Sequence, residues 1–351
     1  MNASDNGHRL GVVTLDPPGP VVAGAVGQWT LTLTVGAYGI DEGGTIKVAQ
    51  RFASDWETPQ FDRPTGPAFT SVTTTGNAKL AARFDRKGHI RPFMRCMVID
   101  VYDGSLSPGD VVQVVFGDQS QGSPGIRAQS FQESIHEFLV LVDPTNACLV
   151  QEIVDSPSFP VVAGEAISAI CILPSDGCVG ESVDVFVDGR DRWGNPAPAV
   201  GEITWDGGAD VAEIQDGRLA LKASGCGRVI VTFQGRPYTS NPIRIHAKVP
   251  QRMHYWGDLH AQTGATVGTG TEEEYFAFGR DKARLDFTSH QGNDFQMTDE
   301  DWQRLNDVTR RFHEDGKFVV FPGYEWSANS PAGGDRNVFY RNEGKPIIRS
   351  S

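Results

Sequence analysis

Apolar and polar positions alternate in short runs over the first part of the chain. Residues 28–35 (QWTLTLTV) alternate and are rich in β-branched side chains, and residues 111–116 and 138–142 are apolar runs. Turn-forming residues separate such runs, as at residues 107–110 (SPGD). Short β-branched runs divided by turns are typical of strands. The pattern therefore predicts a β-sandwich domain over residues 1–150.

A second β-rich segment follows the first. Its expected strands are short and apolar, and they occupy residues 166–173, 182–187, 218–222 and 228–233. Residues 191–196 (DRWGNP) have the glycine, asparagine and proline of a tight turn between two of these strands. This turn resembles those of immunoglobulin-like modules. We therefore expect a smaller, immunoglobulin-like β-sandwich domain over residues 151–248.

The sequence PVVAG occurs twice, at residues 20–24 and 160–164, each time shortly before a β run. This repeat suggests that the two β-rich segments are related units, although five common small residues can also match by chance.

A long irregular stretch, residues 55–69 (DWETPQFDRPTGPAF), interrupts the first segment. It is polar, proline-rich and aromatic, which leaves two interpretations open. It is either a binding loop or a crossover between sheets that lies on the surface.

After residue 250 the pattern changes to strands that alternate with helices. The expected strands cover residues 254–259, 285–289 and 317–321. Two capping boxes mark the helix starts, because Thr271 is followed three residues later by Glu274 and Thr298 by Asp301. A strand–helix–strand–helix–strand order implies parallel strands with right-handed crossovers.

Metal-binding side chains follow each of these three strands. The first strand leads into Asp258 and His260, the second into His290 and Asp294, and the third into Glu325. Because the carboxyl ends of parallel strands meet on one face, we expect these side chains to be neighbours. Imidazole and carboxylate ligands suit Zn, Mn or Fe. Such a cation activates water and polarises a carbonyl or phosphoryl group.

The same residues resemble the motifs of the PHP (polymerase and histidinol phosphatase) family. The similar stretches are residues 255–260 (YWGDLH), 285–290 (LDFTSH) and 322–326 (PGYEW). The arrangement looks like a bacterial PHP-like family of unassigned function with β-rich N-terminal regions. The resemblance implies that His260, His290 and Glu325 bind the metal, and that residues 251–351 form the first half of an α/β barrel.

The chain departs from the family pattern at three places. Gln262 stands where the family has a second histidine, Ser289 where it has an aspartate, and Asp335–Arg336 where a later histidine is expected. The resemblance therefore implies Asp335 as a substitute ligand and leaves the metal number open. We expect Arg336 to orient an anionic group of the substrate.

Length also limits what this chain does alone. A barrel of this type needs roughly 250 residues, whereas about 100 follow Pro250. We therefore expect the N-terminal portion of a longer protein, with little or no hydrolytic activity by itself.

Charge narrows the classes of partner. Forty-four acidic residues against 31 basic ones give a net charge of -13, which argues against binding to nucleic acid or to anionic membranes. No apolar stretch approaches the roughly 20 residues of a membrane span, and the N-terminus lacks an apolar signal core. These features predict a cytoplasmic protein.

Five cysteines are spread along the chain without a C-x-x-C pair: Cys96, Cys148, Cys171, Cys178 and Cys226. They could form a zinc site or a disulfide. We expect buried free thiols in a reducing compartment.

Two functions remain in competition. The first is a metal-dependent hydrolase of phosphoester or amide bonds, with Asp258 and Asp294 as catalytic carboxylates beside the metal. Its substrate would be a small anionic molecule or a polymer. The second is a non-catalytic binding or structural protein whose β-sandwiches recognise a partner and whose α/β part has lost its chemistry, consistent with Gln262 and Ser289. The sequence leaves the oligomeric state open.

Overall fold

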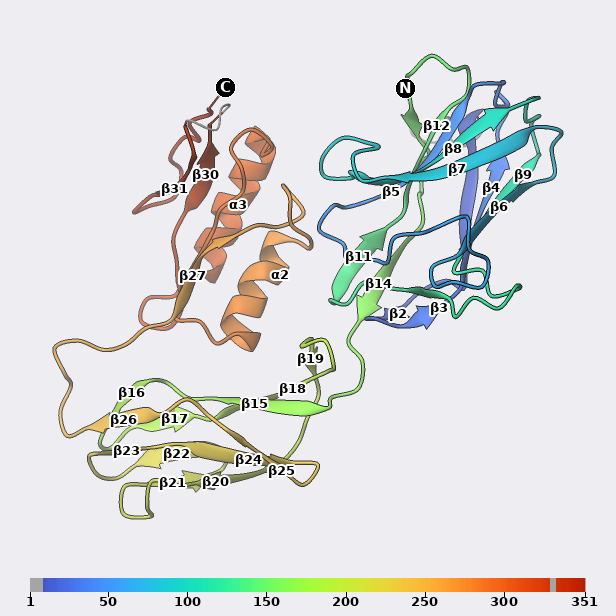
Figure 1. The fold of residues 1–351 in the computed structure, drawn as a ribbon. Coiled ribbons are helices and arrows are strands. Elements are labelled where there is room, and N and C mark those ends of the chain that lie inside the picture. The colour runs from blue at the N-terminus through green and yellow to red at the C-terminus, as the bar shows by residue number, and fades with distance from the viewer. Residues whose placement is uncertain (1–8, 329–332, 351) are drawn as a thin grey trace. The chain divides into compact units, whose positions relative to one another are not determined.

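The computed structural model describes residues 9–328 and 333–350. The chain forms two compact units, one that ends at Val162 and one that begins at Ala163. Strands predominate in both units, and helices α2 and α3 belong to the second (Figure 1). Over the described ranges, no helix has both the length and the apolar character that a membrane span requires.

Two large sheets build the first unit. The four-stranded sheet has the order β1-β4-β9-β6, with β1 Gly11–Asp16, β4 Trp29–Val35, β6 Thr70–Thr74 and β9 Val111–Phe116. The five-stranded sheet has the order β13-β12-β5-β8-β7, with β5 Thr45–Gln50, β7 Lys79–Asp85, β8 Arg95–Tyr102, β12 Leu139–Asp143 and β13 Gln151–Glu152. Smaller sheets pair β10 Ile126–Arg127 with β3 Val26–Gly27, and β14 Ser158–Val162 with β11 Glu133–Glu137 and β2 Val21–Val22.

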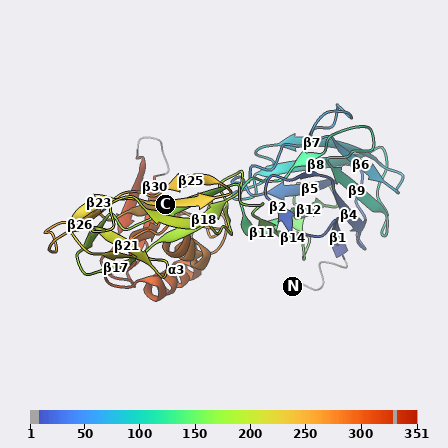
Figure 2. The same ribbon diagram turned by 90° about the horizontal axis from the view of Figure 1, so that it is seen from below.

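Side-chain alternation explains why the two large sheets face each other. In β4, Leu31 and Leu33 point inward and are fully buried, while the threonines between them are less buried. Ile46 of β5 and Ile99 of β8 belong to the same core. Burying each such side chain contributes about 1.5–3 kcal/mol. Figures 1 and 2 show the resulting layers, with β5, β7 and β8 on one side and β4, β6 and β9 on the other. The predicted β-rich character of this segment is confirmed.

The repeated pentapeptide has a structural meaning. Val21 and Val22 of β2 pair in parallel with Val161 and Val162 of β14. The two copies of PVVAG therefore lie side by side in one sheet of the first unit. The unit consequently continues through β14, beyond the boundary expected at residue 150.

Four small sheets build the first part of the second unit. Their orders are β15-β18-β19, β16-β26-β23, β17-β22-β21 and β20-β24-β25. The strands are β15 Ser168–Ile172, β16 Asp176–Cys178, β17 Ser182–Asp184, β18 Phe186–Arg190, β19 Pro196–Ala197, β20 Glu202–Trp205, β21 Ala212–Gln215, β22 Arg218–Leu221, β23 Gly225–Gly227, β24 Val229–Phe233, β25 Arg236–Thr239 and β26 Ile243–His246. Leu219, Val229, Val231 and Ile243 are fully buried in their common core.

A buried carboxylate connects β26 to the segment after it. Asp176 of β16 binds His246 Nε2 at 2.6 Å through Oδ1, and His254 Nδ1 at 2.7 Å through Oδ2. Its side chain is only 2% exposed. Burial alone would raise the pKa of Asp176, but the hydrogen bonds from His246 and His254 outweigh burial and lower it to about 2.

The C-terminal part combines a parallel sheet with a hairpin. Strands β27 Gly257–Ala261, β28 Phe287–His290 and β29 Val319–Val320 run parallel, whereas β30 Gly323–Ser327 and β31 Asp335–Phe339 pair antiparallel. The helices are α2 Glu272–Ala277, the one-turn π-helix η1 Phe278–Lys282 and α3 Asp299–Phe312. Both predicted capping boxes are present, at Thr271 with Glu274 and at Thr298 with Asp301.

The predicted fold class is wrong. The middle segment distributes its strands over four three-stranded sheets instead of an immunoglobulin-like sandwich. The C-terminal part is not the first half of an α/β barrel, because parallel pairing stops at the two-residue strand β29. The next strand, β30, forms an antiparallel hairpin with β31. The motifs predicted the strand order but held no information about this change of direction.

The five cysteines are all free thiols. Cys96, Cys171 and Cys178 are buried, as expected, whereas Cys148 and Cys226 are exposed. Burial raises the pKa of Cys96 and of Cys171 to about 11 each.

The Asp176 contacts predict a defined acid sensitivity. Because the folded pKa of Asp176 lies below its unfolded value of about 3.9, its contribution to the free energy of unfolding is full above about pH 4. That contribution is lost as the pH falls toward 2. Replacing Asp176→Asn should cost about 2–3 kcal/mol at pH 7 and less at pH 2.5.

Urea unfolding at both pH values measures this difference. Asp210→Asn, at an exposed position of the same segment, serves as the control and should change stability by less than about 0.5 kcal/mol. An equal cost of Asp176→Asn at the two pH values would contradict the prediction.

Candidate functional site

The backbone of Glu325 pairs with the segment that comes after β28. The Glu325 N–H donates to Gly292 O at 3.0 Å, and the Asp294 N–H donates to Glu325 O at 2.9 Å. This parallel bridge places Glu325 beside the carboxyl end of β28. The Glu325 side chain is 7% exposed, so its carboxylate is largely removed from solvent.

Two side chains from the end of β27 reach the Glu325 carboxylate. The Gln262 amide Nε2 donates to Glu325 Oε2 at 2.9 Å, and His260 Nε2 lies 3.6 Å from the same oxygen. The Thr266 hydroxyl donates to Gln262 Oε1 at 2.7 Å. This bond fixes the orientation of the amide, so that its NH₂ group points at Glu325.

The loop at residues 264–270 therefore positions Gln262. Gly268 packs directly on this residue, since a Cβ at position 268 would lie 2.2 Å from Gln262 O. Its missing side chain permits the close approach. The loop thus contacts Gln262 through both the Thr266 hydroxyl and the Gly268 backbone.

The β30–β31 hairpin supplies the other side of the His260 ring. Glu325 stands opposite Asn337 in the antiparallel register, and side chains opposite one another share a face of the sheet. The Asn337 amide contacts His260 Nδ1, with its nitrogen at 2.8 Å and its oxygen at 3.1 Å. Asn337 Nδ2 also donates to Leu259 O at 3.1 Å. Asn337 thus orients the imidazole and leaves Nε2 directed at Glu325.

The electrostatic environment raises the pKa of Glu325 above its ordinary value. Burial raises the pKa of Glu325, and the charges of Asp335 and Asp294 raise it further. The interactions with His260 and Gln262 act in the opposite direction. The surplus of carboxylates makes this position attractive to a cation.

His290 lies apart from this group. It is buried, and its Nδ1 accepts from the Gly292 N–H at 3.2 Å. Its Nε2 therefore carries the proton and faces Thr263 Oγ1 at 3.0 Å. Burial, followed by the charge of Arg304, lowers the pKa of His290 to about 4. The His290 ring is therefore neutral, and both of its nitrogens have hydrogen-bond partners in the protein.

The remaining predicted residues are divided between two faces. Asp335 shares the Glu325 face of the hairpin, whereas Arg336 lies on the other face. There the Arg336 guanidinium stands 5.4 Å from the Trp326 ring centre. The structure therefore does not bring Arg336 to Glu325, because the pleat of β31 turns it away.

The two aspartates expected beside the metal have structural partners. Asp294 is buried, and its Oδ1 accepts from the Ser327 N–H at 2.8 Å. Asp258 is exposed, and its Oδ1 accepts from the His260 N–H at 3.0 Å. The Asp294 carboxylate therefore holds the backbone of β30, while the Asp258 carboxylate holds the backbone at the end of β27.

Across residues 9–328 and 333–350, no three His, Cys, Asp or Glu side chains gather in a way that could hold a metal ion. The structure brings His260 and Glu325 together, whereas both His290 nitrogens bond to Gly292 and Thr263 instead. The predicted Zn, Mn or Fe cofactor stays a prediction. Sequence reasoning missed Asn337 and Thr266, because neither residue type signals a site without the hairpin and the loop that place them.

Comparison with known proteins gives a family and two relatives. A family described as "Protein of unknown function (DUF3604)" matches residues 266–350. An uncharacterized protein of Chlamydia trachomatis is 22% identical over 321 residues, and one of Chlamydia muridarum is 21% identical. In each case the match covers 83% of this chain and 50% of the relative. The chain thus spans about half the length of these relatives.

Among solved structures, the C-terminal domain of the Streptococcus pyogenes antigen I/II-family protein AspA has a TM-score of 0.26 and 9% identity. It covers 68% of this chain and 99% of that domain. The Streptococcus agalactiae BspA C-terminal domain has a TM-score of 0.24 and 7% identity, and covers 65% of this chain and 95% of that domain. Similarity this low supports no inference about this chain.

The expected membership of the PHP-like family is wrong. The family that matches the C-terminal residues is DUF3604, and the Chlamydia relatives carry no assigned function. The motifs around His260, His290 and Glu325 are short, and short motifs alone do not distinguish families.

The hydrogen bond from Gln262 predicts a measurable shift in the pKa of Glu325. Hydrogen bonds to charged groups contribute about 1.5–3 kcal/mol, and about 1.4 kcal/mol corresponds to one pKa unit. Gln262→Leu should therefore raise the pKa of Glu325 further, because it removes an interaction that lowers it, and carbon NMR of the glutamate carboxyl groups measures the change. Gln303→Leu, at an exposed position of α3, is the control. A pKa unchanged by Gln262→Leu would show that the bond does not stabilise the carboxylate.

Proposed function

We propose that His260 and Glu325 bind one divalent cation, and that the protein containing this chain hydrolyses a phosphoester or amide bond there. The observation that carries the proposal is the 3.6 Å separation between His260 Nε2 and Glu325 Oε2. Hydrogen bonds of this type have distances of about 2.7–3.2 Å. Two ligand atoms of a tetrahedral metal ion, each about 2.1 Å from it, lie about 3.4 Å apart.

The surrounding side chains support a cation at this position. With Nδ1–H donating to Asn337 Oδ1 at 3.1 Å, His260 keeps Nε2 unprotonated and directed at the carboxylate, as outer hydrogen bonds do around bound metals. Gln262 and Thr266 hold the carboxylate in place. Asp294 and Asp335 add negative charge without approaching closely enough to complete a three-residue ligand set.

This ligand set leaves most positions around a cation to water or substrate. Imidazole with carboxylate favours Zn, Mn or Fe. When bound, such a cation would lower the pKa of a water molecule and polarise a phosphoryl or carbonyl group. Since the chain spans about half the length of its curated relatives, we expect little turnover from this chain alone.

Calorimetric titration of the chain with Zn²⁺ and with Mn²⁺ tests the cation site. We expect one ion per chain, and a loss of affinity of at least tenfold in both His260→Ala and Glu325→Gln. His89→Ala, in the first unit, should bind as the unaltered chain does. The absence of stoichiometric binding, or full affinity in both variants, would reject the proposal.

A second candidate is a non-catalytic binding or structural protein. One observation favours it, namely that no three-residue metal group occurs in the described residues. This function requires no stoichiometric transition metal, so the same titration separates the two candidates.

A further inference from the structure

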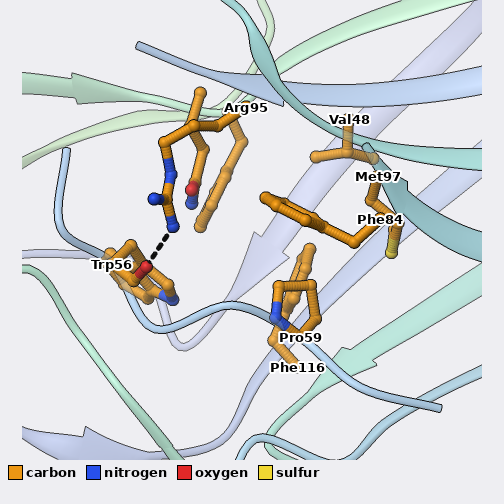
Figure 3. Close-up of a pocket in the computed structure, with 9 residues that line it drawn as sticks. Val48, Trp56, Pro59, Phe84, Arg95, Met97 and Phe116 are labelled. Carbon is orange, nitrogen blue, oxygen red and sulfur yellow. Dashed lines mark hydrogen bonds between the residues drawn. The ribbon is translucent and has the colours of Figure 1, made fainter. Parts of the chain in front are cut away.

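A pocket lies between the two large sheets of the first unit, far in sequence from Glu325. Figure 3 shows Trp56 and Arg95 on one side, and Phe84, Pro59 and Phe116 on the other. Trp56 and Pro59 come from the irregular stretch at residues 55–69. This stretch is therefore not a crossover confined to the surface, since Trp56 is 1% exposed and belongs to the core.

Hydrogen-bond donors without partners gather at this pocket. Within the described ranges, Trp56 Nε1 and Arg95 Nε are buried and have no hydrogen-bond partner. The His136 ring, which does not line the pocket, stacks on Trp56 with the ring centres 5.2 Å apart, and its Nδ1 faces Glu133 Oε2 at 3.2 Å. A buried polar atom without a partner is costly and uncommon. A ligand with a hydrogen-bond acceptor could therefore satisfy two unpaired N–H groups at this pocket.

The charge at the pocket is positive. The Arg95 guanidinium donates to Trp56 O and stands 5.6 Å from the Phe84 ring centre. Arg86 and Arg127 lie close enough to lower the pKa of Arg95 further, after burial as the main cause, while Asp55 alone opposes them. An aromatic pocket often attracts cations, but Arg95 lines this one and Asp55 is itself paired with Arg127, so an anion is favoured beside Arg95.

The size of the pocket limits the occupant. The whole pocket has about 10 Å³ of space for a water-sized group, which is room for one such group. One carboxylate oxygen matches this space, and the rest of a ligand would extend from it toward solvent.

We propose that the first unit binds a small organic carboxylate between Arg95 and Trp56. The carboxylate accepts hydrogen bonds from Arg95 Nε and Trp56 Nε1. Its apolar body packs against Phe84 and Pro59. This site is independent of the cation site proposed at Glu325.

Calorimetric titration of the full chain with benzoate tests the site, with benzylammonium as the oppositely charged ligand of similar shape. We expect benzoate to bind at least tenfold more tightly. Arg95→Met keeps an apolar stem but removes the donors, and should weaken benzoate binding at least tenfold. Trp56→Phe keeps a ring but removes the N–H, and should weaken binding at least tenfold, because a hydrogen bond to a charged carboxylate contributes about 1.5–3 kcal/mol.

Arg83→Met is the matched control, since Arg83 lies on the neighbouring strand β7 in an exposed ion pair with Asp100. It should leave benzoate affinity unchanged. Circular dichroism checks the fold of each variant. If Arg95→Met does not fold, the proposal is judged by the affinity for benzoate against benzylammonium and by the effect of Trp56→Phe on benzoate binding. Equal binding of both ligands, no benzoate binding, or full affinity in a folded Arg95→Met chain would overturn the proposal.

Discussion

The pairing of Glu325 with the segment after β28 determines which side chains meet in the C-terminal part. Two backbone hydrogen bonds, to Gly292 O and from the Asp294 N–H, place the β30 strand there. The β30–β31 hairpin then presents Asn337 on the same face as Glu325 and turns Arg336 to the other. A shift of one residue in this register would exchange the two faces. The composition of the site therefore depends on backbone pairing before it depends on side-chain chemistry.

Two polar sites on this chain differ in how they satisfy their buried groups. Around Glu325, the contacts of Gln262 and Asn337 form a connected network. Around Trp56, two buried donors remain without partners in the described part of the chain. Connected networks hold side chains in one arrangement, whereas unsatisfied donors store an unfavourable free energy that an acceptor can relieve. The first site pairs its polar groups without a ligand, whereas the second leaves two donors unpaired.

Local signals in the sequence were sufficient for elements that local physics determines. The capping boxes at Thr271 and Thr298 need only residues three positions apart, and both form. The alternation in β4 needs only one buried face. Pairing between strands that are distant in sequence could not be predicted from such local signals. The antiparallel turn from β30 to β31 depends on partners that no local pattern specifies, so Asn337 was missed and a barrel was expected. His260 and Glu325 were predicted together because strand ends converge, while the hydrogen bonds of His290 could not be anticipated.

The pairing of β2 with β14 joins the two ends of the first unit. About 140 residues separate these strands, and closing a loop of that length carries an entropic cost that grows slowly with its length. During synthesis the sheet cannot be completed until Val162 has left the ribosome. An expression fragment that stops near residue 150 would leave the β2 edge without its partner and open to association with other chains.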